Sequence, residues 1–160
     1  MNIFENEIIK NDREINMMSP LTWAYVGDSV YELYIRLYLS NNTNLNPHKM
    51  HVESIKYVKA EAQAKIVKKL EEENILTDDE KEIVRRGRNT ENHHLPRHAT
   101  HEDYSYSTAF EALIGYLYLN KEEERLNLIL KKAIDLINLY WTCPIVSLKN
   151  GISLNIEWNC

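Results

Sequence analysis

The chain has 160 residues, of which 44% are hydrophobic and 27% charged, and its formal net charge is −5 at pH 7. This length suits one domain with a continuous core, and the negative charge argues against a generally basic nucleic-acid-binding surface. No apolar run approaches the roughly 18 residues of a membrane span, and the N-terminus lacks a secretory pattern. Cys143 and Cys160 have no metal-ligand spacing, so the sequence predicts a reduced cytoplasmic protein without membrane contact.

Helical signals dominate the first half of the chain. Ser19, followed by proline, is a favoured N-cap and predicts a helix over 20–39. Asn46, also followed by proline, precedes a segment over 47–70 that is rich in Ala, Lys, Glu and Gln and is predicted to be helical. A basic run on this segment is interleaved with glutamates, which is typical of a solvated face: Lys56, Lys59, Lys65, Lys68 and Lys69.

The second half of the chain is also predicted to be helical. Residues 77–80, TDDE, form a capping-box pattern that predicts a short helix ended by Gly87. A polar, histidine-rich loop follows, then an apolar helix over 104–119 and an amphipathic helix over 121–141. The tail over 143–160 contains ISLNIEW, which alternates weakly in the manner of an extended segment. The fold class predicted is all-α.

Two carboxylates interrupt helices that are otherwise apolar. Asp28 falls within a stripe predicted to be buried and formed by Leu21, Ala24, Tyr31, Ile35 and Leu39. Glu111 is the single charge of AFEALIGYLYL, a segment that is apolar nearly all round and therefore predicts a central buried helix. Gly115, one turn later, allows another helix or a ligand to approach closely.

Two interpretations of these carboxylates stay open at this point. In the first, a buried arginine or a helix cap satisfies each acid, as is usual for buried carboxylates. In the second, Asp28 and Glu111 converge on a hard cation such as Mg²⁺, which prefers oxygen ligands and relieves their mutual repulsion. Glu32 is a weaker candidate, because it also stands four residues before Arg36 in the orientation that favours a surface ion pair.

Four stretches, in order, resemble the ribonuclease III family. YVGDSVYELYIR is similar to the signature helix of its catalytic domains, and YSTAFEALIGYLYL is similar to its second acidic helix. RRGRN and EERL are similar to Mini-ribonuclease III, the short bacterial branch that lacks a double-stranded-RNA-binding domain. The resemblance covers about residues 21–137. It implies a ribonuclease III-like catalytic domain over 1–142, with a tail over 143–160 of unknown role.

The resemblance also implies an activity and its partners. A homodimer would cleave double-stranded RNA with Mg²⁺, or with Mn²⁺ in its place, and leave 5′-phosphate and 3′-hydroxyl ends. Asp28 matches the family's essential aspartate, and Glu111 matches its metal-binding glutamate. The longer enzymes carry two further carboxylates at positions that are Ala24 and Thr108 here, so the cluster is reduced to two. The implied task is maturation of the large-subunit (23S) ribosomal RNA precursor, with a ribosomal protein or subunit as a further partner.

A local basic patch offers a surface for RNA. The RNA-binding residues expected are Arg85, Arg86, Arg88, Asn89 and Arg97, because arginine binds phosphate oxygens in bidentate geometry. The alternative is a solvated basic helix end that is stabilised by the helix dipole. For the whole chain, the alternative function is a non-catalytic RNA-binding or ribosome-associated protein on the same fold.

Overall fold

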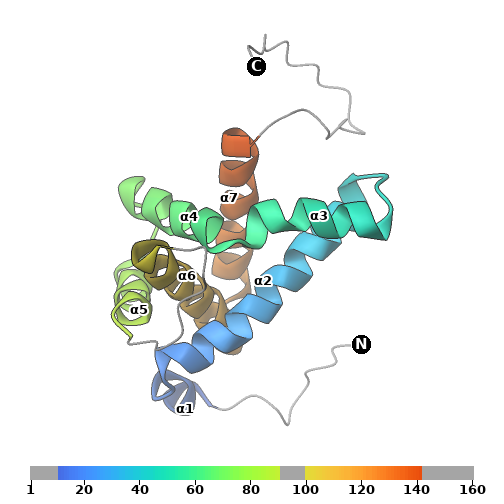
Figure 1. Cartoon of the computed structure of the whole chain (residues 1–160). Helices are drawn as coiled ribbons and strands as arrows, with labels where there is room; N and C mark the ends of the chain where they lie inside the picture. The colour runs from blue at the N-terminus through green and yellow to red at the C-terminus, as the bar shows by residue number, and fades with distance from the viewer. Residues whose placement is uncertain (1–10, 91–99, 142–160) are drawn as a thin grey trace.

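The computed structural model describes residues 11–90 and 100–141, and these residues form helices and no strand, as the sequence predicts. Figure 1 shows their arrangement, in which α3 and α4 follow one another end to end and α2 runs obliquely past them. None of the described helices combines the length and apolar character needed to cross a membrane. The helices are α1 (Asp12–Asn16), α2 (Pro20–Asn42), α3 (Pro47–Val58), α4 (Ala60–Glu72), α5 (Asp78–Arg88), α6 (His101–Leu119) and α7 (Glu123–Trp141).

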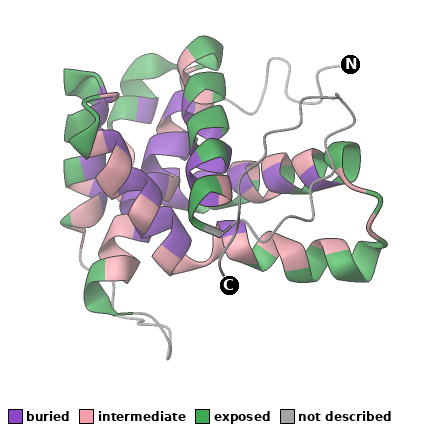
Figure 2. Ribbon diagram, turned by 90° about the horizontal axis from the view of Figure 1, so that it is seen from above, coloured by how far each residue is buried: buried purple, intermediate pink, exposed green. Residues whose placement is uncertain are grey.

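Helix α6 is the centre of the molecule, which confirms the prediction made from its apolar sequence. It packs against α2, α4, α5 and α7. Its residues from Ser107 to Phe110 and from Ala112 to Gly115 are buried, and Figure 2 shows the buried residues gathered where the helices meet. A helix surrounded by others must be apolar on all sides, because each face replaces water with side chains from a neighbour.

The segment over 47–70 is not one helix. It divides at Lys59, whose backbone is extended (φ −65°, ψ 148°), so that this residue ends α3 and begins α4. The sequence gives no clear signal for the break, because neither glycine nor proline stands near Lys59. Tertiary contacts favour it: the buried hydroxyl of Tyr31 donates a hydrogen bond to the Tyr57 carbonyl at 3.3 Å, near the end of α3.

Other helix boundaries differ by a few residues from the prediction. Helix α6 begins at His101 rather than 104, because Thr100 acts as its N-cap and accepts a hydrogen bond from the backbone N–H of Asp103. Helix α7 begins at Glu123 rather than 121. The short helix α1 was not predicted; it begins with a capping box formed by Asn11 and Glu14.

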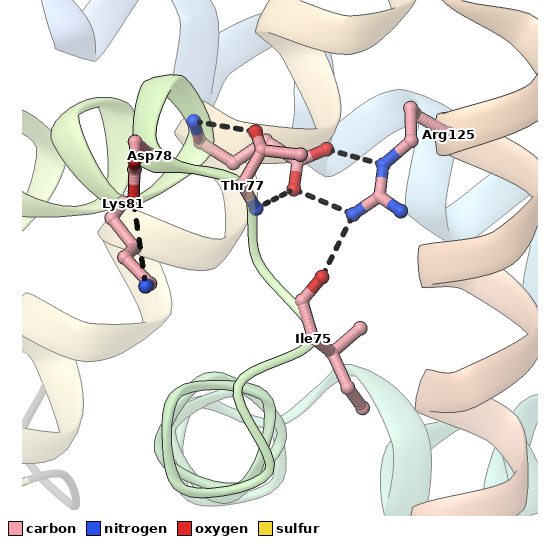
Figure 3. A network of polar contacts seen from close by, with 6 residues as sticks. Ile75, Thr77, Asp78, Lys81 and Arg125 are labelled. Carbon is pink, nitrogen blue, oxygen red and sulfur yellow. Dashed lines mark hydrogen bonds and ion pairs between the residues drawn. The ribbon is translucent and has the colours of Figure 1, made fainter.

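A buried ion pair joins the start of α5 to α7. The Glu80 side chain is only 3% exposed and completes the capping box with Thr77. Arg125 donates two hydrogen bonds to the Glu80 carboxylate, at 2.8 and 2.7 Å, and a third to the Ile75 carbonyl at 3.0 Å. Figure 3 shows this network. Arg125 belongs to the EERL stretch, so part of that resemblance reflects a contact that holds the fold together.

Candidate active site

Asp28 and Glu111 come together because α2 and α6 cross with almost no space between their backbones. A methyl group added to Gly27 would overlap the carbonyl oxygen of Glu111, and one added to Gly115 would overlap the carbonyl oxygen of Trp23. Both glycines are therefore required by the close approach of the two helices. Of the two explanations that the sequence left open for Gly115, the structure supports the approach of a helix.

The prediction that Asp28 lies within the buried stripe was wrong. Tyr31, Ile35 and Leu39 are buried, but Asp28 is exposed on the single chain. Because successive residues of a helix are 100° apart, the line of contact with α6 passes through Gly27 and leaves Asp28 at the edge of the buried face. The acid thus lies where it meets solvent on one side and protein on the other.

Glu111 is mostly buried, and its surroundings disfavour the ionised form. Burial is the largest cause and the charge of Asp28 adds to it, so that the pKa of the Glu111 carboxyl rises to about 8. The pKa of Asp28 is also raised, first by partial burial of its carboxyl and then by the charge of Glu32. The charge of Asp28 therefore acts on the Glu111 carboxyl across the crossing of α2 and α6.

No basic side chain compensates these two acids in the part of the chain that the structure describes. The ion pairs there involve other carboxylates. Glu32, the weaker candidate, pairs with Arg36 at 2.9 Å, as its spacing predicted. The buried arginine partner that the first interpretation of Asp28 and Glu111 offered is therefore absent from residues 11–90 and 100–141.

The neighbouring positions supply no further carboxylate. Ala24 and Thr108, which stand where the longer enzymes carry acids, are both buried, and the Thr108 hydroxyl donates a hydrogen bond to the Tyr104 carbonyl within α6. The phenol of Tyr104 lies near Glu111. The pKa of Tyr104 is raised, first by burial and then by the charge of Glu111. Within the described residues, no cluster of three or more acidic, histidine or cysteine ligands forms.

Sequence reasoning missed a third polar side chain at this site. Gln63 is 1% exposed on α4, and its amide acts on Glu111 in the direction that lowers the carboxyl pKa, against burial and Asp28. Neither of its amide atoms has a hydrogen-bond partner among the described residues. The signal in the sequence was slight: Gln63 is the chain's only glutamine and stands in the Ala-rich run EAQAK.

The donor set fits a hard divalent cation. Mg²⁺ and Mn²⁺ favour carboxylate, amide and water oxygens, and Mg²⁺ retains several waters when a protein offers few ligands. Asp28, Glu111 and Gln63 supply oxygens from three different helices, and no sulfur or imidazole ligand stands among them. The mutual repulsion and burial of the two acids are the costs that a cation between them would offset.

The arginines of the expected RNA-binding patch do not form one cluster. Arg85 is exposed and binds Glu82 with two hydrogen bonds of 2.7 Å. Arg86 lies over the Trp23 ring, 4.4 Å from its centroid, and so ties α5 to α2. Asn89 caps the C-terminus of α5. Arg97 lies outside the described residues.

Arg88 points toward the central helix instead. It donates a hydrogen bond to the Tyr106 hydroxyl at 2.9 Å and lies over the ring of that residue. Lys68 of α4 lies over the same ring, 4.8 Å from its centroid, and binds Glu102 at 2.7 Å. Arg88 of α5 and Lys68 of α4 therefore both contact the Tyr106 ring.

Comparisons with known proteins agree with this architecture. Residues 21–122 match the family model described as the Ribonuclease III domain. The chain is 41% identical over 129 residues to Mini-ribonuclease 3 of Staphylococcus aureus, covering 81% of this chain and 96% of that protein. It is 42% identical over 137 residues to Mini-ribonuclease 3 of a Thermoanaerobacter species, covering 86% and 95% respectively.

A solved structure has a similar fold. The X-ray structure of a protein from Fusobacterium nucleatum is 34% identical, with a TM-score of 0.67, and the match covers 76% of this chain and 96% of that one. The family model and the structural neighbour thus both support the all-α fold. The chain belongs to the ribonuclease III family, in its Mini-ribonuclease 3 branch, and is an endoribonuclease.

Proposed function

We propose that this endoribonuclease depends on Mg²⁺, or on Mn²⁺ in its place, and cleaves double-stranded RNA. The observation that carries the proposal is the pair of acids at the crossing of α2 and α6, which have no cationic partner in the described residues. Asp28 is close enough to raise the pKa of Glu111. Such a pair is costly unless a ligand of opposite charge compensates it.

The two carboxylates have different parts in the proposed reaction. Glu111, the more buried, would hold the cation together with Asp28, and Asp28, at the solvent edge, also orients the attacking water toward the phosphorus. A bound divalent cation would lower the pKa of that water and stabilise charge on the phosphate. Attack in line with the 3′ oxygen leaves a 5′-phosphate and a 3′-hydroxyl. The catalytic domain is assigned to 1–142, and the tail 143–160 has no assigned role.

The RNA-binding residues are proposed to be Arg85, Arg86, Arg88 and Asn89 at the end of α5, together with Arg97. Within the described part, Arg88 is the best supported, because Tyr106 brings it beside Lys68 and two cations there suit one strand's phosphates. Among the described residues, the exposed Arg85 pairs with Glu82 on its own helix, and such exposed pairs are weak. Phosphate oxygens can therefore compete for its guanidinium.

We propose that the chain acts as a homodimer through α2. Tyr25, Leu33 and Leu37 are 80%, 56% and 52% exposed and follow one side of this helix. Large apolar side chains that are exposed on one helix favour contact with another protein surface. Tyr25 is a surface neighbour of Asp28, since they are three residues apart on the helix. A second copy bound here would bring two active sites to opposite strands of one duplex.

The biological substrate proposed is the stem of the precursor of large-subunit ribosomal RNA, cleaved in the cytoplasm. Support for this choice is the membership of the Mini-ribonuclease 3 branch. A test compares a precursor stem with an unrelated duplex of equal length. We expect a single cut in each strand of the stem, with 5′-phosphate ends, and cuts at random positions would contradict a dedicated substrate.

The decisive test of the activity uses four matched proteins on duplex RNA, single-stranded RNA and duplex DNA, each with Mg²⁺, Mn²⁺ or EDTA. The wild type should cleave only duplex RNA and only with a divalent cation. Asp28→Asn and Glu111→Gln should each lose about a thousand-fold or more in cleavage rate, because each removes a ligand, while duplex binding stays near that of the wild type.

The matched control is Glu32→Gln, which removes an acid four residues from Asp28 on the same helix. Because Glu32 pairs with Arg36, its loss should leave the cleavage rate within a few-fold of the wild type. Equal losses in Glu32→Gln and Asp28→Asn would contradict a site made of two carboxylates, and cleavage by the wild type in EDTA would contradict the role of the cation.

A further inference from the structure

Gln63 is a buried polar residue whose surroundings on the protein do not explain it. Its neighbours along α4 are buried and apolar: Ala62, Ala64, Ile66 and Val67. Both atoms of its amide lack a hydrogen-bond partner among residues 11–90 and 100–141. Buried amides are almost always hydrogen-bonded, because an unpartnered one loses its bonds to water and gains none in return. Methionine would fill nearly the same volume without this cost.

The position of the amide indicates what it binds. Gln63 faces Glu111, since its amide opposes the rise in pKa of that carboxyl, but its atoms stand outside hydrogen-bond geometry. An ionised carboxylate only accepts hydrogen bonds, whereas an amide both donates and accepts. The Nε2 group can therefore donate to the ionised Glu111 carboxylate and fix its orientation.

We propose that Gln63 is a positioning residue for the divalent cation: its Nε2 donates a hydrogen bond to the ionised Glu111 carboxylate and orients that ligand toward the ion. This inference rests on the proposed cation-dependent function and extends it to a third helix. With only two carboxylates at the site, the orientation of each ligand matters, and outer contacts that orient ligands contribute substantially to metal affinity.

The test measures Mn²⁺ affinity without RNA, from the rise in melting temperature of the full chain over a series of Mn²⁺ concentrations. In Gln63→Met, the dissociation constant for Mn²⁺ should rise about ten- to a hundred-fold, the range seen when outer-shell partners are removed. In EDTA, the melting temperature of Gln63→Met should equal or exceed that of the wild type, because the variant removes an unpartnered amide. Gln63→Leu repeats the experiment with a branched side chain.

Asn138→Leu is the matched control. This partly buried amide is satisfied away from the site, since it accepts a hydrogen bond from the Tyr57 hydroxyl at 2.8 Å and donates one to the Tyr38 hydroxyl at 3.1 Å. Its replacement should lower the melting temperature in EDTA and leave the Mn²⁺ dissociation constant unchanged. Loss of the Gln63 amide should therefore weaken Mn²⁺ binding without destabilising the fold, and loss of the Asn138 amide should do the reverse.

Several results would overturn the inference. One is an unchanged Mn²⁺ dissociation constant in Gln63→Met; another is a fall in melting temperature, or failure to fold, in both Gln63 variants without metal. If the wild type binds Mn²⁺, Asp28→Asn does not, and Gln63→Met binds normally, the role of Gln63 fails alone. If the wild type shows no stabilisation by Mn²⁺ or Mg²⁺ and no cation-dependent cleavage, the proposed function fails as well.

Discussion

Two glutamates of this chain are withdrawn from water, and their environments are opposite. Burial favours the neutral form of Glu80, but hydrogen bonds from Arg125 and from Thr77 outweigh it and hold the pKa below its ordinary value. For Glu111, burial and the nearby Asp28 act in the same direction and raise the pKa to about 8. Arg125 compensates the charge of Glu80 within the fold, whereas Glu111 has no cationic partner among the described residues.

This difference separates a structural acid from a functional one. Glu80 links α5 to α7, and its contacts are complete without any ligand. Glu111 makes the fold less stable when ionised, which is the condition under which a divalent cation binds most strongly. Perturbed titration in a partly open site is typical of functional positions, and here it coincides with an unpartnered amide on a neighbouring helix.

The largest effect on stability should come from breaking the satisfied pair with Arg125→Met. The variant leaves the Glu80 carboxylate buried and unpaired, which costs about 3–5 kcal/mol of unfolding free energy at neutral pH. Denaturant titration measures this loss. Arg36→Met removes the exposed partner of Glu32 and should cost roughly 0.5 kcal/mol or less. Similar losses in both variants would contradict the structural role of the Glu80 pair.

Glu111→Gln should stabilise the fold, whereas Arg125→Met destabilises it. Because the folded-state pKa of Glu111 is about 8, above the ordinary value of 4.5, the folded state binds this proton more tightly than the unfolded chain. The resulting stability is complete below pH 4.5 and is lost between pH 4.5 and 8, at up to about 1.4 kcal/mol per pH unit. In EDTA, melting temperatures of the variant and the wild type should agree near pH 4.5 and diverge toward pH 8, where the variant is more stable. Parallel pH curves would contradict this.

Gly115→Ala should affect the fold and the site together. The added methyl overlaps the carbonyl oxygen of Trp23, so α2 and α6 must separate, at a cost of about 1–3 kcal/mol. The separation also moves Asp28 away from Glu111 and should weaken Mn²⁺ binding in the melting assay. Ser105→Ala, on the same helix, is the control and should change neither quantity. Destabilisation with unaltered Mn²⁺ affinity would show that the crossing does not hold the two acids together.

The smallest effect expected is on RNA affinity. Arg88→Ala should weaken duplex binding and reduce the slope of log affinity against log salt by about one, as for the loss of one phosphate contact. Binding is measured by fluorescence anisotropy between low and moderate salt with Asp28→Asn as the background, so that the duplex is not cleaved. Lys49→Ala, on α3, removes an equal charge elsewhere and should leave the slope unchanged. Identical slopes for both variants would remove Arg88 from the RNA surface.

Local patterns predicted much of the fold. N-caps before proline located the starts of α2 and α3, and the TDDE capping box located that of α5. The break at Lys59 could not be predicted in this way, because no glycine or proline marks it and packing between distant segments decides the conformation. Likewise, the stripe on α2 was identified correctly, but whether Asp28 lies inside it or at its edge depends on the line along which α6 crosses.

The candidate site was accessible to sequence reasoning only in part. Asp28 and Glu111 were conspicuous because a charge within an apolar helix breaks a strong pattern. Gln63 breaks none: an Ala-rich helix with lysines and glutamates readily accepts a glutamine, and only the structure places it in the core with its amide unpartnered. Similarly, the adjacent arginines in RRGRN looked like one patch, although helix geometry sends Arg86 to Trp23 and Arg88 to Tyr106.

The most direct measurement of the shared cation is the anomalous scattering of Mn²⁺ in crystals of the full chain, compared between the wild type and Glu111→Gln. The wild type should give a peak within coordination distance of carboxylate oxygens from both Asp28 and Glu111, or joined to them through a shared hydration shell. The peak should be lost or much weakened in the variant. A peak bound by neither acid, or one that persists unchanged without the Glu111 carboxylate, would contradict the account.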